Sequence, residues 1–65
     1  MNQEFLRLRD VQAITRLSRA TIYRLSNAKK FPQPVKLTDR GASAWVRDEI
    51  NEWVAERIAA SRKAA

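Results

Sequence analysis

The chain has 65 residues, a net charge of +6 at neutral pH, and neither cysteine nor histidine. These features exclude a disulfide framework and leave no ordinary ligand set for zinc, so we expect no metal and no cofactor. A domain this small buries only about 60% of its unfolded surface, which limits it to one small core. Since no apolar run approaches the ~20 residues of a membrane span and the start has no signal-peptide core, we expect a cytoplasmic, nucleoid-associated bacterial protein.

The positive charge is unevenly distributed. Residues 1–45 contain nine Lys and Arg against three Asp and Glu, whereas residues 46–65 contain four of each. The whole excess therefore lies in the first part of the chain, where it would attract a polyanion such as nucleic acid. Charge alone equally permits a soluble basic domain whose charged face is merely solvated.

The first predicted element is a short apolar segment, residues 5–8. It is expected to be either a stub strand or a coil that packs Phe5 or Leu6 on the core. A first helix is predicted over about residues 9–15. Val11 and Ile14 are three positions apart in this segment, which places them on one face toward the core.

The second predicted helix, about residues 19–28, is the most informative segment. Ser18 is a good N-cap, because its hydroxyl can accept an orphan backbone N–H of the first turn. Basic, polar and aromatic groups follow at once: Arg19, Thr21, Tyr23 and Arg24. A helix, the short turn 15–17 and a capped basic helix form a helix-turn-helix, whose second helix enters the major groove of DNA.

The next segment predicts a β-hairpin. Residues 31–34, Phe-Pro-Gln-Pro, stop the second helix, because proline disfavours helical geometry in the residue before it. Residues 35–37 alternate apolar, polar, apolar as a short strand should, and residues 44–46 can return as a second strand. The polar connection 38–43 contains the single glycine of the chain. Such a hairpin, the usual form of a wing, must pack on the helices to be stable, and Trp45 is large enough to anchor it.

A third helix is predicted from near residue 47. Its apolar residues recur at three- and four-residue steps, at Ile50, Trp53, Val54 and Ile58. Its acidic residues line another face, at Asp48, Glu52 and Glu56, and would repel phosphate, so this helix should lie away from DNA. Residues 59–65 lack a core residue and are expected to fray.

Together these segments predict one domain over residues 1–65, mostly α with a small β-hairpin: a three-helix winged helix-turn-helix with its core at about 5–58. The predicted core residues are Val11, Ile14, Leu17, Ile22, Leu25, Phe31, Val35, Trp45, Ile50, Trp53 and Val54.

Three segments together resemble the AlpA-like prophage regulators: residues 17–24 (Leu-Ser-Arg-Ala-Thr-Ile-Tyr-Arg), residues 31–37, and Trp45 followed by residues 49–53. These regulators are related to phage excisionases and, more distantly, to the MerR-type DNA-binding domain. The resemblance implies a small winged helix-turn-helix that binds double-stranded DNA. It implies a transcription activator of a prophage integrase gene, or a recombination directionality factor that bends DNA. The family often has glycine where this chain has Lys29, and an aliphatic residue where it has Ser26.

The resemblance maps the DNA-facing helix onto Ser18, Arg19, Ala20, Tyr23 and Arg24, and the wing onto residues 38–43 with Arg40 at its tip. Arg19 and Arg24 would read guanine edges or hold phosphate; the alternative is two solvated arginines. For Thr21 the alternatives are a phosphate contact and a capping role, and for Tyr23 a DNA contact and a place in the core.

Four further basic residues are candidates for the DNA backbone: Lys29, Lys30, Lys36 and Arg40. Instead of contacting DNA, Lys29 and Lys30 could simply make the turn after the second helix soluble. Lys36 and Arg40 could be ordinary charges on a strand edge, which discourage pairing with another strand. Trp45 and Trp53 could stack on bases, but their apolar spacing favours the core. No residue is assigned a catalytic role, because the acidic stripe of the third helix has no histidine, cysteine or phosphate-binding loop beside it.

Three functions are therefore open: sequence-specific DNA binding, a protein-interaction module with the same fold, and RNA binding. RNA binding is less favoured, because proteins that recognise RNA sequences commonly expose aromatic residues on a sheet. Expected partners are double-stranded DNA, a second copy on adjacent DNA sites, and a recombinase or RNA polymerase.

Overall fold

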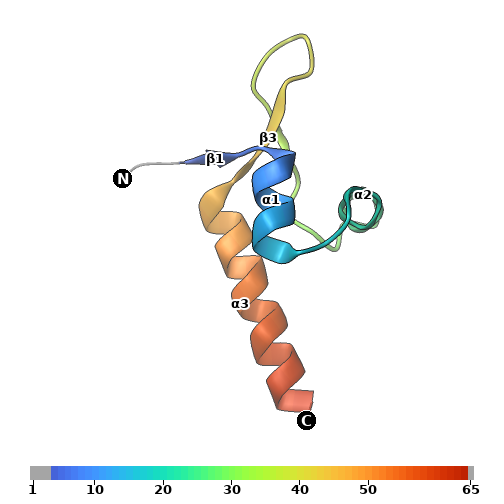
Figure 1. Cartoon of the computed structure of the whole chain (residues 1–65), viewed down its shortest axis with the longest axis vertical. Helices are drawn as coiled ribbons and strands as arrows, with labels where there is room; N and C mark the ends of the chain where they lie inside the picture. Colours follow the sequence, from blue (N-terminus) through green and yellow to red (C-terminus); the bar gives the residue numbers. More distant parts are fainter. Residues whose placement is uncertain (1–3, 65) are drawn as a thin grey trace.

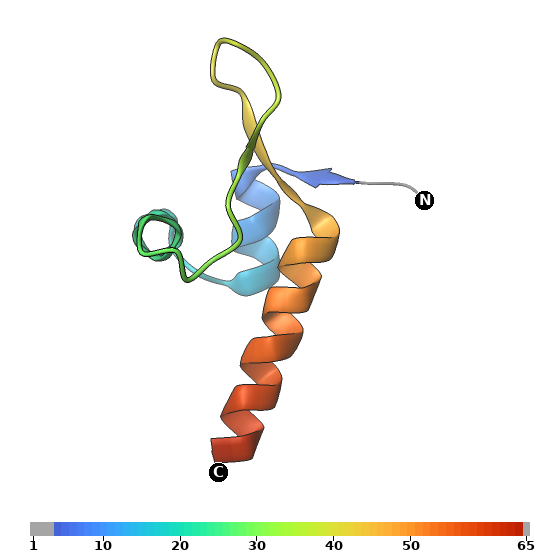
Figure 2. The same ribbon diagram turned by 180° about the vertical axis from the view of Figure 1, so that it is seen from behind.

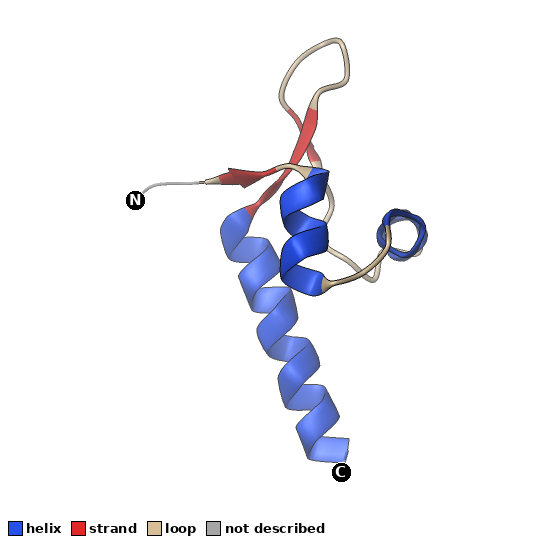
Figure 3. Cartoon of the chain, viewed as in Figure 1, coloured by secondary structure: helices blue, strands red, loops and turns tan. Residues whose placement is uncertain are grey.

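The computed structural model describes residues 4–64, which fold into three helices and three short strands (Figures 1 and 3). In chain order these are β1 (Phe5–Leu6), α1 (Leu8–Thr15), α2 (Arg19–Asn27), β2 (Val35–Lys36), β3 (Ser43–Val46) and α3 (Arg47–Ala64). The architecture is the predicted one, a mostly helical winged helix-turn-helix. The predicted limits of α1 and α2 lie within one residue of the observed ones.

The strands form one antiparallel sheet in the order β1-β3-β2, so that β3 is central. The predicted stub strand is β1, which pairs Leu6 with Trp45, whereas β2 pairs Val35 with Ala44. Strand β3 is paired on both edges and also packs against α1 and α3, and its Ala44 and Trp45 are buried, at 0% and 2% exposure. Of the two alternatives for the first strand, Leu6 faces the core and Phe5 is exposed.

The core contains side chains from the three helices and from the sheet. Its buried members come from β1, α1, α2, the segment after α2, β3 and α3: Leu6, Val11, Ile22, Phe31, Trp45 and Ile50. Partly buried side chains surround them: Leu8, Leu17, Leu25, Trp53 and Val54. Nine of the eleven predicted core residues therefore lie in or against the core.

The other two predicted core residues, Ile14 and Val35, are wrong, since 38% and 39% of their surfaces are exposed. Helix α1 packs on β1 and β3 with its amino end nearest the sheet (Figure 1), and Ile14 lies in the last turn of α1. Val35 lies on β2, an edge strand that has no neighbour on its outer side. Periodicity placed both side chains on an inner face, but no other element covers them.

The two tryptophans fasten the segment after α2 to the rest of the fold. The Trp45 indole N–H donates to the Pro32 carbonyl and the Trp53 indole N–H donates to the Lys30 carbonyl, both at 3.0 Å. The Phe31 ring lies edge-on to Trp53, with ring centroids 4.8 Å apart. Both indoles therefore have structural partners, as buried or half-buried indole N–H groups usually do, and this confirms their packing role.

Helix α2 ends in a Schellman motif, in which the Lys30 N–H donates to the Leu25 carbonyl and the Lys29 N–H to the Ser26 carbonyl. This motif places Lys29 in the left-handed region, at φ +62°. Left-handed geometry favours glycine, because a side chain crowds the following carbonyl. The position where AlpA-like proteins often have glycine is therefore a strained position in this chain.

Ser26 is buried on the inner face of α2, at 7% exposure. Its hydroxyl has no hydrogen-bond partner within the described part of the chain. A buried hydroxyl without a partner costs free energy. An aliphatic residue, as AlpA-like proteins often have here, would avoid that cost.

Helix α3 continues to Ala64, so the described part of the segment from residue 59 is helical, and residue 65 lies outside the described residues. Fraying of this segment in solution stays a prediction. Alanine and arginine are strong helix formers, and Arg62 and Lys63 lie in the last turn, where cations favour the helix dipole. The end of α3 lies at the opposite end of the molecule from the β2–β3 loop (Figures 1 and 2). No helix within residues 4–64 is long and apolar enough to cross a membrane.

Candidate nucleic-acid interface

The start of α2 is held by the predicted cap. The Ser18 hydroxyl oxygen accepts the Thr21 N–H at 3.1 Å and donates its own proton to Thr21 Oγ1 at 2.9 Å. Thr21 thus takes the capping alternative in this structure, and a DNA contact by it stays a prediction. The cap fixes where α2 begins, and hence where the side chains of its first turn point.

The outer face of α2 presents basic and aromatic groups. Arg19, Ala20, Tyr23 and Arg24 are all exposed, and Tyr23 has 41% of its surface open to solvent. This excludes the core alternative for Tyr23. The Arg19 guanidinium lies over the Tyr23 ring, 5.7 Å from its centroid, a cation–π contact that restricts the arginine to one side of the helix.

The β2–β3 loop is a closed turn that stands out from the body of the molecule (Figure 3). The Leu37 N–H donates to the Ala42 carbonyl at 2.7 Å, and the Gly41 N–H donates to the Thr38 carbonyl at 3.2 Å. Gly41 has φ +93°, a conformation that side chains rarely permit. Arg40 precedes it, fully on the surface, and Lys36 is exposed on the edge strand β2.

A groove of about 320 Å³ connects the loop to α2. We call it the wing groove; its lining residues are 7–9, Tyr23, 41–43 and Trp45. Because Tyr23 and residues 41–43 share it, the outer face of α2 and the loop belong to one surface. The structure thereby brings together the two regions that the sequence assigned to DNA.

The wing groove also contains Arg7 and Arg9, which sequence reasoning missed. Both are exposed at the amino end of α1. The available signal was the pair of arginines alternating with leucines, Leu6-Arg7-Leu8-Arg9, in which the leucines pack toward the core and the arginines are exposed. It was read only as an apolar segment that reaches the core.

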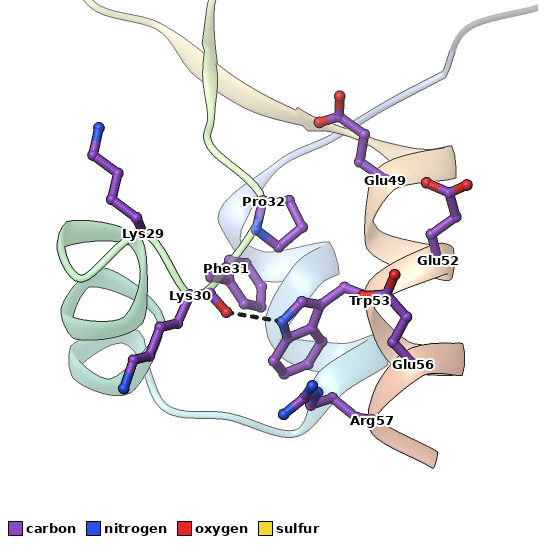
Figure 4. Close-up of a pocket in the computed structure, with 9 residues that line it drawn as sticks. All are labelled: Lys29, Lys30, Phe31, Pro32, Glu49, Glu52, Trp53, Glu56 and Arg57. Atoms are coloured by element: carbon purple, nitrogen blue, oxygen red, sulfur yellow. Dashed lines mark hydrogen bonds between the residues drawn. The ribbon is translucent and has the colours of Figure 1, made fainter. Parts of the chain in front are cut away.

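Lys29 and Lys30 lie elsewhere. They line a larger groove, of about 690 Å³, which we call the α3 groove (Figure 4); its other lining residues are Phe31, Pro32, Glu49, Glu52, Trp53, Glu56 and Arg57. Both lysine side chains point away from α3 (Figure 4). Three carboxylates share this groove, so its field attracts a polyanion less than that of the wing groove.

The chain was compared with known proteins. The family model described as "Prophage CP4-57 regulatory protein (AlpA)" matches residues 4–58. The chain belongs to this AlpA family. The chain is also similar to the uncharacterized protein ORF88 of Enterobacteria phage P4, with 38% identity over 61 residues, which is 94% of this chain and 68% of that protein. No solved structure matches the chain.

The AlpA match spans every element that forms the wing groove and the outer face of α2, from β1 through β3. The match ends at residue 58, in the part of α3 whose side chains are exposed. The family is described as a regulatory one, and its matched region coincides with the folded body of this AlpA-family protein.

Proposed function

We propose that this protein binds double-stranded DNA in a sequence-specific way, with α2 in the major groove and the β2–β3 loop on the backbone or in the minor groove. The observation that carries this proposal is the shared surface: a capped helix with exposed Arg19, Tyr23 and Arg24, joined through the wing groove to a loop that carries Arg40. The charge supports it, since the +6 excess lies within residues 1–45.

Some of these residues would contact base edges and others would contact phosphate. Arg19 is the first residue of α2, where side chains reach base edges, and Ala20 is small enough to allow close approach. Arg24 lies in the last turn of α2 and would read a base edge or hold phosphate. Ser18 and Thr21 hold the helix start. Lys36 and Arg40 hold phosphate, and Lys29 and Lys30 contribute less because their groove is shared with carboxylates.

The regulatory family supports two roles for such binding. One is activation of transcription from a prophage or mobile-element integrase gene, and the other is direction of recombination as an excisionase. We propose one of these roles and no enzymatic one, with a cytoplasmic, nucleoid-associated location and a single domain over residues 1–65. Mapping bound sites across a host genome separates the roles, because sites would lie at an integrase promoter or at an attachment site.

The α3 groove, in which three carboxylates balance three basic residues, supports a second, compatible function as a protein-interaction surface. Glu49, Glu52 and Glu56 would repel phosphate, so a second copy of the chain, a recombinase or an RNA polymerase would meet the molecule there. RNA binding through stacked aromatics has less support, because both indole N–H groups bond to backbone carbonyls.

Titration against DNA at several salt concentrations tests the main proposal. Each phosphate neutralised gives a slope of about −0.9 in log affinity against log salt, so four to six contacts predict a slope of roughly −4 to −5. Binding should be tighter to a duplex recovered from mapped sites than to random duplex or to single-stranded RNA. A slope near zero, or equal affinity for all three, would count against the proposal.

A further inference from the structure

The wing groove has an arginine pair that neither α2 nor the loop supplies. Arg7 precedes α1 and Arg9 lies in its first turn, and both line the groove opposite residues 41–43 of the loop. We propose that this groove holds a phosphate of the DNA backbone between the guanidinium groups of Arg7 and Arg9. The inference rests on the proposed function and adds α1 as a third contact to the duplex.

The groove has the charge for this role. Arg7 and Arg9 line it and no acidic residue does, whereas three acidic residues line the α3 groove beside three basic ones. Asp10, the nearest acid in sequence, is turned back onto its own helix, where its carboxylate accepts the Arg7 backbone N–H at 3.0 Å. A phosphate in the wing groove would therefore meet positive charge without a competing anion in the lining.

The side chains of both arginines are available to contact a phosphate. Within residues 4–64 the ion pair that forms joins Arg47 to Glu4 and involves neither of them. Their side chains are exposed, so contact with a phosphate would not require any part of the fold to move. On the other side of the groove, residues 41–43 are Gly, Ala and Ser, whose small side chains leave room for a backbone strand.

The position of the groove matches the shape of a duplex. In B-DNA the major and minor grooves are separated by one sugar-phosphate strand. If α2 occupies the major groove and the loop reaches the adjacent minor groove, the strand between them must cross the surface between α2 and the loop. That surface is the wing groove, because Tyr23 of α2 and Gly41 of the loop both line it. Arg7 and Arg9 then face phosphate rather than base edges.

The test uses the full chain and variants Arg7→Gln and Arg9→Gln, titrated against a mapped site and a random duplex at several salt concentrations. The Arg7→Gln, Arg9→Gln double variant should lose affinity for both duplexes by a similar factor, about eight-fold at 0.1 M salt, and its salt slope should fall by about 0.9. Each single variant should show part of this loss on both duplexes, because the two arginines share one phosphate. Arg62→Gln is the matched control, because it makes the same charge change at the exposed end of α3 and should change neither. Arg9→Lys should keep the slope, since a phosphate contact needs the charge.

A neutral probe locates the contact. In duplexes with one methylphosphonate linkage at a time, a replacement on the strand between the two grooves should weaken the wild-type chain but not the Arg7→Gln, Arg9→Gln double variant. If the wild type prefers its site but the glutamine variants behave like Arg62→Gln, the proposed function stands and this inference is overturned. Loss of site preference in either variant would also overturn it, and a wild type without duplex binding would overturn both.

Discussion

The surface made by α2 and the β2–β3 loop differs from α3 in how each uses its polar side chains. On the first, arginines are exposed beside a groove without carboxylates, and the hydroxyls of Ser18 and Thr21 are used to fix the start of a helix. On the second, acidic and basic residues are balanced, and the Trp53 indole ties the segment after α2 to the helix. The difference supports the proposed division between a binding face on α2 and the loop and a supporting element, α3.

If the two regions have these different roles, substitutions in them should have different effects. Changes in the supporting element should lower stability and abolish binding only through unfolding. Changes on the binding face should leave the thermal melt in place and alter affinity or preference for a DNA site.

The largest effect is expected from Trp53→Ala. Truncation of a packed tryptophan costs about 3–5 kcal/mol, a large share of the stability of so small a domain. The Lys30 carbonyl would also lose its donor and Phe31 its ring partner. The variant should lose its cooperative melt in circular dichroism, whereas Ile58→Ala, at an exposed position on the same helix, should keep it. An unchanged melt for Trp53→Ala would contradict the supporting role of α3.

On the binding face, Arg19→Ala should have the largest effect on preference. A bidentate arginine–guanine contact is worth about 1–3 kcal/mol of discrimination. The variant should therefore bind a mapped site less well while its affinity for random duplex changes little, and its melt should remain. Equal weakening on both duplexes would mean that Arg19 holds phosphate.

Arg40→Ala should produce the complementary change. Loss of one phosphate contact at the loop tip should weaken both duplexes by a similar factor, about eight-fold at 0.1 M salt, and reduce the salt slope by about 0.9. Lys30→Gln removes one charge in the α3 groove and should have a smaller effect. If Arg40→Ala alone abolished the preference for the site, the roles of loop and helix would have to be exchanged.

A smaller effect, of opposite sign, is expected at Ser26. Removing a buried hydroxyl that has no partner should raise the free energy of unfolding by about 1 kcal/mol. In a domain of this size that corresponds to a rise in Tm of about 4–8 °C. Ser61→Ala, the same substitution at an exposed position of α3, should leave Tm nearly unchanged. A lower Tm for Ser26→Ala would show that the hydroxyl has a partner in solution.

The smallest effect is expected from Lys29→Gly. Relief of left-handed geometry is worth about 1–2 kcal/mol, and the greater freedom of glycine in the unfolded chain offsets about half of it. The net gain should be at most about 1 kcal/mol, measured by urea unfolding. Lys29→Ala removes the same charge without relieving the strain and should give no gain. Equal stability of the two variants would argue against strain at this position.

The sequence by itself determined the features that depend on neighbours in the chain. Ser18 caps α2 because the acceptor and the N–H it serves lie three residues apart. The end of α2 and the turn at Gly41 follow from proline and glycine, whose backbone preferences are local. Helical spacing placed Val11, Ile22 and Ile50 in the core, because on each helix they lie on the face that packs.

Only the tertiary structure decided which faces are covered and which segments share a surface. Ile14 and Val35 fit an inner face by spacing, yet the edge positions of their elements leave them exposed. Arg7 and Arg9 line the wing groove, while Lys29 and Lys30 line the α3 groove, because folding sets the distance between elements that are separated along the chain. Periodicity describes the faces of one element, and burial and charge environment depend on what packs against them.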